Sequence, residues 1–441
     1  KHAGAWRDTK EVWVKSGGSW RLVHEGEHFL FNVTLNSNNQ SDWSLSSYIS
    51  GQGYGGNKIK GLVTLSGGIT RRQMNLGNFL LKPHRKIYFV GFLIIFLSCL
   101  NLAFIDNEKL INSYAIKQFF WLLLSIVTAF FISRIRLQSI KALAVPLYFF
   151  SILLLVIVLF SDEISGARSW IKLFGFSFQP SELVKISYVF MIAKLYSDLG
   201  SYSKSLIIKY FLGLLFFVIP FILIMIQPDF GSAFMLLLLS MAVIFSFSFN
   251  KKFLFFLLLI TFAISIPIWQ NYLKPYQKQR IINFINPEND PRGYGYNAIQ
   301  SKISIGSGSI IGKGFGNSSQ SKFGFLSEKH TDFAFSVWAE QTGFLGSLIL
   351  SSLYLFLIIY PLLFLSNIKD IFLKVIIFGI SSYFFFHFVV NSLMTIGLFP
   401  VVGIPMILFS YGGTSLLCSS IAFSVSALII SEFRDYNRLG V

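Results

Sequence analysis

Long apolar runs recur along the chain from Lys86 to the C-terminus, separated by short polar segments. Each run approaches the roughly 20 residues that a helix needs to cross a bilayer. The ten predicted spans are residues 87–105, 116–133, 142–160, 181–197, 206–226, 230–249, 252–272, 333–365, 372–396 and 402–430. The pattern therefore predicts an all-α integral membrane protein with about ten transmembrane helices and a large loop between spans seven and eight.

Residues 1–73 follow a different pattern. Polar and apolar residues alternate over 11–14 and 61–65, which indicates short strands. The segment has no apolar core of a signal peptide, and Met74 reads as a natural start. We interpret residues 1–73 as a short β-rich extension, from a foreign fusion or a misjoined reading frame, and assign it no function. Residues 74–441 form the predicted membrane domain.

Composition agrees with a membrane protein. The 441 residues are 54% hydrophobic and 13% charged, whereas soluble domains carry roughly 25% charged residues. The net charge of +17 does not predict nucleic-acid binding, because the basic residues lie between apolar runs and not on a soluble domain. Cys99 and Cys418 both lie within apolar runs, so neither a disulfide framework nor a cysteine metal site is expected.

The short basic loops predict the orientation, because loops rich in Lys and Arg stay on the cytoplasmic side. The basic residues in question are Arg134, Arg136, Lys141, Lys251, Lys252, Lys369, Lys374, Arg434 and Arg438. With ten spans, all of them fall on one side, which places the C-terminus in the cytoplasm. Residues 161–180 and the long loop 273–332 are then periplasmic.

Three polar clusters lie on that periplasmic side, and the third is the long loop. In the first, Pro180 suits the first turn of a helix, and Glu182 and Lys185 are three residues apart on one helix face. This pair is either a structural ion pair or part of a functional cavity, and the residues alone leave both open. In the second, Asp229 follows Gln227-Pro228. We favour a helix cap for Asp229 over a role at the substrate.

The long loop is rich in glycine and lysine and ends at Asp332. Its glycines do not match a nucleotide-binding spacing. Glycines with Lys302 and Lys313 suit a backbone that approaches phosphates, while the alternative is a flexible basic loop near lipid headgroups. Asp332 precedes span eight, where the helix dipole keeps a carboxylate ionised. That suits a base or an ordinary cap, and His330 suits a structural hydrogen bond.

Several motifs in order resemble the SEDS family (shape, elongation, division and sporulation). They are Gly-Ala-Arg-Ser-Trp-Ile at 166–171, Gln-Pro-Ser-Glu-Leu-Val-Lys at 179–185, Gln-Pro-Asp-Phe-Gly-Ser at 227–232, Glu-Lys-His-Thr-Asp-Phe at 328–333 and Ser-Tyr-Gly-Gly-Thr-Ser at 410–415. The resemblance extends from about Met74 to the C-terminus. Gln-Ser-Lys at 300–302 and again at 320–322 resembles the elongation branch, with the division branch as the close alternative.

The resemblance implies a peptidoglycan glycosyltransferase of the bacterial inner membrane that polymerises lipid II at the periplasmic face. It implies Asp332 as the general base and Lys185, Lys302, Lys313 and Arg168 as candidates for binding the diphosphate. Further substrate-binding candidates are Glu182, Trp170, Gln179, Ser181, Glu328, Lys329, His330 and Asp229. A divalent cation, Mg²⁺ or Mn²⁺, is a candidate cofactor, and no organic cofactor is expected.

The implied partners are a class B penicillin-binding protein, the elongation machinery and membrane lipids, with no nucleic acid. A transporter that flips lipid II is the competing hypothesis. It would need functional charges on the cytoplasmic half as well, whereas the polar clusters lie on one side. A scaffold without enzymatic activity is a third possibility, and it would tolerate Asp332→Asn.

Overall fold

The computed structural model describes two units, Lys1–Phe79 and Leu80–Val441, which are treated separately. The described residues are the five N-terminal strands, 82–105, 113–164, 166–173, 176–200, 206–246 and 295–439, with six single positions between 247 and 294. The predicted seventh span, 252–272, lies outside the described residues, as does most of the first part of the long loop.

The first unit is built of antiparallel strands. β1 (Asp8–Ser16) pairs with β2 (Ser19–Leu30). β3 (Thr34–Asn39), β4 (Asp42–Gln52) and β5 (Lys58–Gly68) form a three-stranded sheet in that order. The alternating segments 11–14 and 61–65 lie within β1 and β5, so the predicted β-rich character of this extension is confirmed.

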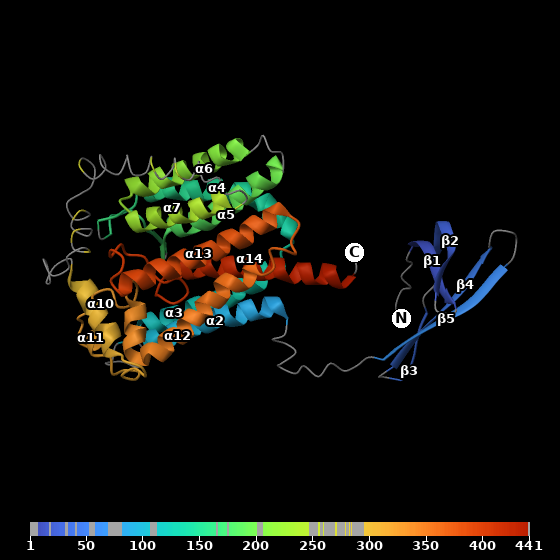
Figure 1. Ribbon diagram of the computed structural model, residues 1–441, viewed down its shortest axis with the longest axis horizontal. Coiled ribbons are helices and arrows are strands. Elements are labelled where there is room, and N and C mark those ends of the chain that lie inside the picture. Colours follow the sequence, from blue (N-terminus) through green and yellow to red (C-terminus); the bar gives the residue numbers. More distant parts are fainter. Residues whose placement is uncertain are drawn as a thin grey trace. The chain divides into compact units, whose positions relative to one another are not determined.

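The second unit is a bundle of long helices lying side by side (Figure 1). They are α2 (Pro83–Ala103), α3 (Ser113–Ile132), α4 (Leu137–Val158), α5 (Pro180–Leu199), α6 (Leu206–Ile226), α7 (Phe230–Phe245), α12 (Ala334–Leu362), α13 (Ile371–Thr395) and α14 (Gly413–Leu439). Among the described residues, seven helices are long and apolar enough to cross a membrane. The exceptions are α5, which carries more polar residues, and α7, which is shorter.

Shorter elements lie in the loops. β6 (Ile171–Leu173) and β7 (Phe176–Phe178) form a hairpin just before α5. α10 (Tyr296–Ser307) and α11 (Ser319–Lys322) belong to the long loop before α12. They lie together beside one end of α12 (Figure 1).

The predicted start of the last span at residue 402 is wrong, because α14 begins at Gly413. Pro405 has no backbone N–H for a helix, and Gly403 has a φ of +73°, in the region that glycine adopts without strain. The segment before α14 is nevertheless buried, with Ile404 2% and Met406 0% exposed. Its apolar composition reflects burial inside the bundle and not helical structure.

The centre of the bundle is formed by α5, α13 and α14. In the most apolar stretch of each helix, 67% of residues are buried in α13 and 83% in α14. The same share is 28% in α3, α4 and α12. The exposed apolar surfaces of α3, α4 and α12 suit contact with lipid. The polar residues of α5, in contrast, are buried in the interior of the bundle. The polar groups of α5 therefore need partners within the protein.

Candidate functional site

The first turns of α5 and α7 are joined by hydrogen bonds. Pro180 occupies the start of α5, as predicted, and Gln179 precedes it. The side-chain amide of Gln179 donates to Asp229 Oδ2 at 2.9 Å and to Ser232 Oγ at 3.3 Å. Asp229 caps α7, because its Oδ1 accepts from the backbone N–H of Ser232 at 3.1 Å. Ser181 Oγ lies 3.2 Å from the same Ser232 hydroxyl. The capping interpretation of Asp229 is thus confirmed.

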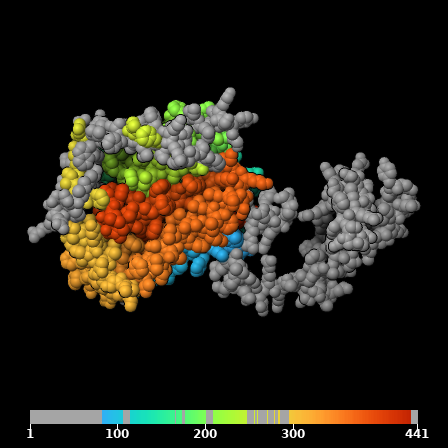
Figure 2. Space-filling model, viewed as in Figure 1, coloured from blue at the N-terminus to red at the C-terminus, as the bar shows by residue number. Residues whose placement is uncertain are grey.

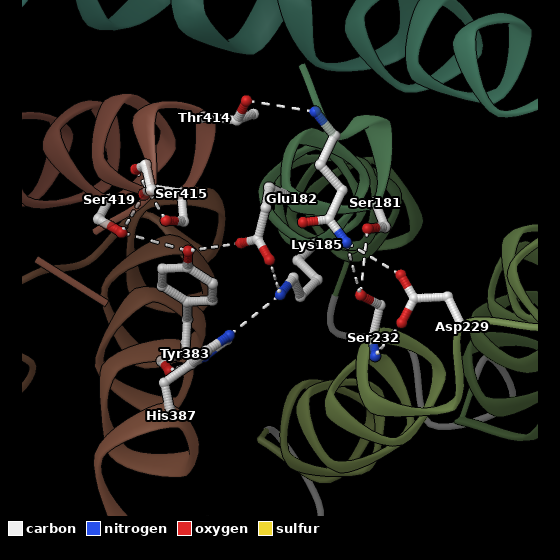
Figure 3. A network of polar contacts seen from close by, with 12 residues as sticks. Ser181, Glu182, Lys185, Asp229, Ser232, Tyr383, His387, Thr414, Ser415 and Ser419 are labelled. Atoms are coloured by element: carbon white, nitrogen blue, oxygen red, sulfur yellow. Dashed lines mark hydrogen bonds and ion pairs between the residues drawn. The ribbon is translucent and has the colours of Figure 1, made fainter. Parts of the chain in front are cut away.

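A second network runs from α5 into α13 and α14 (Figure 3). Lys185 Nζ lies 2.7 Å from Glu182 Oε1 and 3.0 Å from His387 Nε2. The hydroxyl of Tyr383 donates to Glu182 Oε2 at 3.3 Å and lies 3.3 Å from Ser419 Oγ. The side chains of Glu182 and Lys185 are only 3% and 2% exposed. The two predicted charges therefore form an ion pair inside the protein.

The hydrogen bonds of His387 determine which of its ring nitrogens donates and which accepts. Its Nδ1 lies 2.8 Å from the carbonyl oxygen of Tyr383, so Nδ1 carries a proton and donates it. Nε2 is then free to accept from the Lys185 ammonium. An ion pair removed from water is stable only when further hydrogen bonds satisfy its remaining atoms. Tyr383 and His387 provide those bonds.

Asp332 lies two residues before the first residue of α12 and is held through its backbone. The side-chain amide of Asn391 donates to the Asp332 carbonyl oxygen at 2.9 Å and to the Ile404 carbonyl oxygen at 2.7 Å. On the other side, a Cβ added at Gly403 would lie 3.5 Å from Asp332 Oδ2, and one added at Gly231 only 2.8 Å from the Val402 carbonyl oxygen. Segment 402–404 therefore contacts both Asp332 and the start of α7.

The residues before Asp332 are also anchored. The His330 ring stacks on Tyr114 with centroids 4.4 Å apart, and its carbonyl oxygen accepts from the Tyr411 N–H at 2.9 Å. Lys329 Nζ donates to the Ser321 carbonyl oxygen at 2.9 Å. Glu328 accepts from Thr331 Oγ1 at 3.2 Å. Burial and the neighbouring Tyr114 raise the pKa of the Tyr411 phenol.

The remaining basic candidates have different environments. Lys313 Nζ forms an ion pair of 2.7 Å with Glu340, which is fully buried. Lys302 is exposed, and its side chain crosses Gly397, where an added Cβ would lie 1.9 Å from Lys302 Cε. Arg168 is exposed as well. Its backbone N–H donates to the Gln227 carbonyl oxygen at 3.3 Å, at the turn before Asp229.

Trp170 is half-buried and precedes the β6–β7 hairpin, on the same segment as Arg168. The residues missed from the sequence are Glu340, Tyr383, His387 and Asn391. Glu340 and His387 could have been found, because an isolated ionisable residue within an apolar span is expensive unless it has a partner. Tyr383 and Asn391 have no such distinguishing feature in the sequence.

The family assignment rests on a comparison with models of known families. Residues 82–435 match the model of the FtsW, RodA and SpoVE cell cycle proteins. The chain belongs to this family. The match covers the helical bundle up to residue 435, within α14, and residues 1–81 lie outside it. The SEDS resemblance read from the motifs is thereby confirmed, and the chain is a multi-pass membrane protein.

Named relatives of this SEDS chain include RodA and MrdB. The peptidoglycan glycosyltransferase RodA of Treponema pallidum is 30% identical over 405 residues, covering 76% of this chain and 92% of the relative. The peptidoglycan glycosyltransferase MrdB of Escherichia coli K12 is 38% identical over 282 residues, covering 63% of this chain and 75% of the relative. A solved chain of a peptidoglycan synthase complex that coordinates polymerization and crosslinking matches with a TM-score of 0.67 and 29% identity. The match covers 79% of this chain and 97% of the solved chain.

Proposed function

We propose that this protein is a peptidoglycan glycosyltransferase that polymerises lipid II at the periplasmic face of the inner membrane during cell elongation. The observation that carries the proposal is the position of Asp332 at the start of α12, with its carbonyl oxygen held by Asn391 and its carboxylate beside segment 402–404. This places the Asp332 carboxylate beside a segment that in turn contacts the first turn of α7.

In the proposed reaction, Asp332 removes the proton from the acceptor hydroxyl as its oxygen attacks the anomeric carbon of the donor sugar. The bond from that carbon to the diphosphate breaks, and the lipid diphosphate leaves with the electron pair. The dipole of α12 favours the ionised carboxylate near its N-terminus. A positioned general base typically contributes about 10²–10⁴-fold to the rate.

The departing diphosphate needs cations that are not already neutralised. Lys185 and Lys313 each form an ion pair with a buried glutamate. Arg168 and Lys302 are exposed, so they become the preferred candidates for this role. Trp170, near Arg168 in the chain, is a candidate surface for a sugar or polyprenyl group.

A divalent cation fits this site only together with the substrate. Among the described residues, no three His, Cys, Asp or Glu side chains gather to hold a metal ion. Mg²⁺ is commonly bound by one or two carboxylates together with substrate phosphates. Asp332 could supply a carboxylate, and the cation would neutralise charge on the diphosphate when bound.

The proposed partner is a class B penicillin-binding protein that crosslinks the new glycan. The relatives named RodA and MrdB and the solved synthase complex support both this partner and the elongation role. A division role of the FtsW type, with the same chemistry, remains the alternative within the family. It would be indicated if the chain functioned with the division transpeptidase and not with the elongation one.

The test is lipid II polymerisation by the purified chain with its transpeptidase and Mg²⁺ or Mn²⁺, using Asp332→Asn. We expect this variant to lose about 10²–10⁴-fold in rate with an unchanged thermal unfolding midpoint. Asp370→Asn is the matched control, since Asp370 is also a carboxylate at a helix start, where it accepts from Phe372 N–H at 2.8 Å. Full activity of Asp332→Asn would exclude the general-base role. Lipid II transfer across vesicles by a chain that makes no polymer would favour the transporter.

A further inference from the structure

Helix α12 is interrupted at Gly343, which has a φ of +69° and non-helical geometry. The N–H groups that follow the kink bond to the long loop. Phe344 N–H donates to the Ser309 carbonyl oxygen at 2.9 Å, and Leu345 N–H donates to the Ile310 carbonyl oxygen at 3.1 Å. Loop carbonyls thus replace the helical acceptors that the kink removes, so loop residues 308–314 and α12 share one hydrogen-bonded structure.

The loop lies directly against the helix backbone. A Cβ added at Gly308 would lie 2.1 Å from the Ala339 carbonyl oxygen, and one added at Gly312 2.2 Å from the Gln341 carbonyl oxygen. Larger residues would therefore separate the two segments. The N–H of Lys313 donates to the Glu340 carbonyl oxygen at 2.9 Å. The position of the loop on α12 is fixed by backbone contacts on both sides of the kink.

Large apolar side chains are exposed where the loop meets the kink of α12. Ile310 is 65% and Ile311 79% exposed, beside Phe344 at 62% and Leu345 at 50%. The exposed strip continues along α12 through Leu348 and Ile349. In Figure 2 the surface of α12, in orange, continues into the yellow-orange surface of α10 and α11. The loop isoleucines therefore extend the exposed apolar face of a membrane-spanning helix.

The length of α12 indicates the depth of the loop. Its 29 residues span about 43 Å, which exceeds the hydrocarbon core of about 30 Å. The kink is nine residues after Ala334, or about 14 Å along the axis. If the far end of α12 lies at the opposite boundary, the kink lies at the near boundary of the hydrocarbon. Irregular backbone is tolerated there when its polar groups are bonded within the protein.

We propose that loop residues 308–312 form a membrane-inserted wedge, with Ile310 and Ile311 in contact with lipid acyl chains of the leaflet near the start of α12. The partner is the bilayer itself, because the wedge is continuous with the lipid-facing strip of α12. The wedge holds the long loop, and through it the approach to Asp332, at a fixed height above the hydrocarbon. It depends on α12 crossing the membrane and not on the proposed reaction.

The experiment places a fluorescent bimane on Ile311→Cys in a full-length chain whose Cys99 and Cys418 are replaced by Ala. The labelled protein is reconstituted into phosphatidylglycerol–phosphatidylethanolamine vesicles that contain lipids spin-labelled at a shallow or a deep acyl position. We expect Ile311 to lose as much emission as a Leu348→Cys control on the strip, with the shallow label quenching more. Asn317→Cys, at an exposed polar position of the same loop, should be quenched by aqueous iodide and not by lipid.

Iodide quenching at Ile311 equal to that at Asn317, without lipid quenching, would overturn the proposal. A second result would also overturn it: no lipid quenching at Ile311 alone, but a blue shift of its emission when the transpeptidase is added. That outcome would identify the strip as a protein interface. Since labelling reports position directly, neither result depends on catalytic activity.

Discussion

At the scale of single residues, Asn391 has the most specific task in the site. One side-chain amide satisfies two backbone carbonyls, those of Asp332 and Ile404. Asn391 is fully buried, and leaving buried polar groups unpaired costs about 1–3 kcal/mol each. We infer that Asn391 is a positioning residue, since it acts on Asp332 only through the backbone.

Asn391→Leu removes both hydrogen bonds with little change in volume. We expect a lower unfolding midpoint and, in addition, a fall in kcat for lipid II polymerisation larger than any change in KM. Gln118→Leu is the matched control, because this buried amide also donates to a carbonyl oxygen, that of Ser410, at 3.3 Å. If both variants lose stability and activity in the same proportion, Asn391 is merely structural.

At the scale of elements, the ion pair of α5 connects that helix to α13. Glu182→Gln would leave the Lys185 cation buried without a counter-charge, and breaking such a pair typically costs about 3–5 kcal/mol. We expect the double variant Glu182→Gln/Lys185→Met to recover most of that stability, because no charge then remains. The measurements are thermal unfolding in nanodiscs and lipid II polymerisation.

The double variant separates the two interpretations that the sequence left open. A stable and active double variant means that the pair only joins α5 to α13. A stable but inactive one means that the charges take part in the reaction. A double variant no more stable than Glu182→Gln alone would contradict the electrostatic account of the network.

The sequence predicted helices well and their irregularities poorly. Nine of the ten apolar runs coincide with described helices, because length and apolar composition decide whether a segment can span a bilayer. The same composition misplaced the start of α14, since segment 402–412 is apolar through burial and not through helical structure. The kink at Gly343 was also missed, because it depends on loop carbonyls that lie more than thirty residues earlier in the chain.

In the site, too, contacts between residues close in the sequence were predicted and contacts between distant residues were not. Local features were recognised, namely the cap at Asp229 and the pairing of Glu182 with Lys185, because they depend on neighbours within one turn. Partners that lie far apart in the sequence were not recognised. Lys313 was read as a phosphate ligand, but its ion-pair partner Glu340 is 27 residues away, and no spacing rule connects them.

At the scale of the whole molecule, the starts of four helices gather on one side. Gln179 N–H, before α5, bonds to Thr414 in the first turn of α14. Gly231 of α7 contacts Val402, and the segment containing Val402 is held to Asp332, before α12, by Asn391. The polar clusters of these helix starts therefore face the same side of the membrane, which is the arrangement expected of a site open to one compartment.

This gathering predicts a crossing that the described residues do not include. Since α7 and α12 start on the same side and α7 ends at the other, we expect the predicted seventh span, 252–272, to cross the membrane between them. We expect alkaline phosphatase fused after Ser307 to be active in the periplasm, and green fluorescent protein fused after Ser246, Asn367 or Leu439 to fluoresce in the cytoplasm. The basic residues Lys251 and Lys369 near two of these points favour the same orientation. If green fluorescent protein also fluoresced when fused after Ser307, the seventh span would be excluded and the long loop, with Asp332, would lie on the cytoplasmic side, where a periplasmic polymerase could not work.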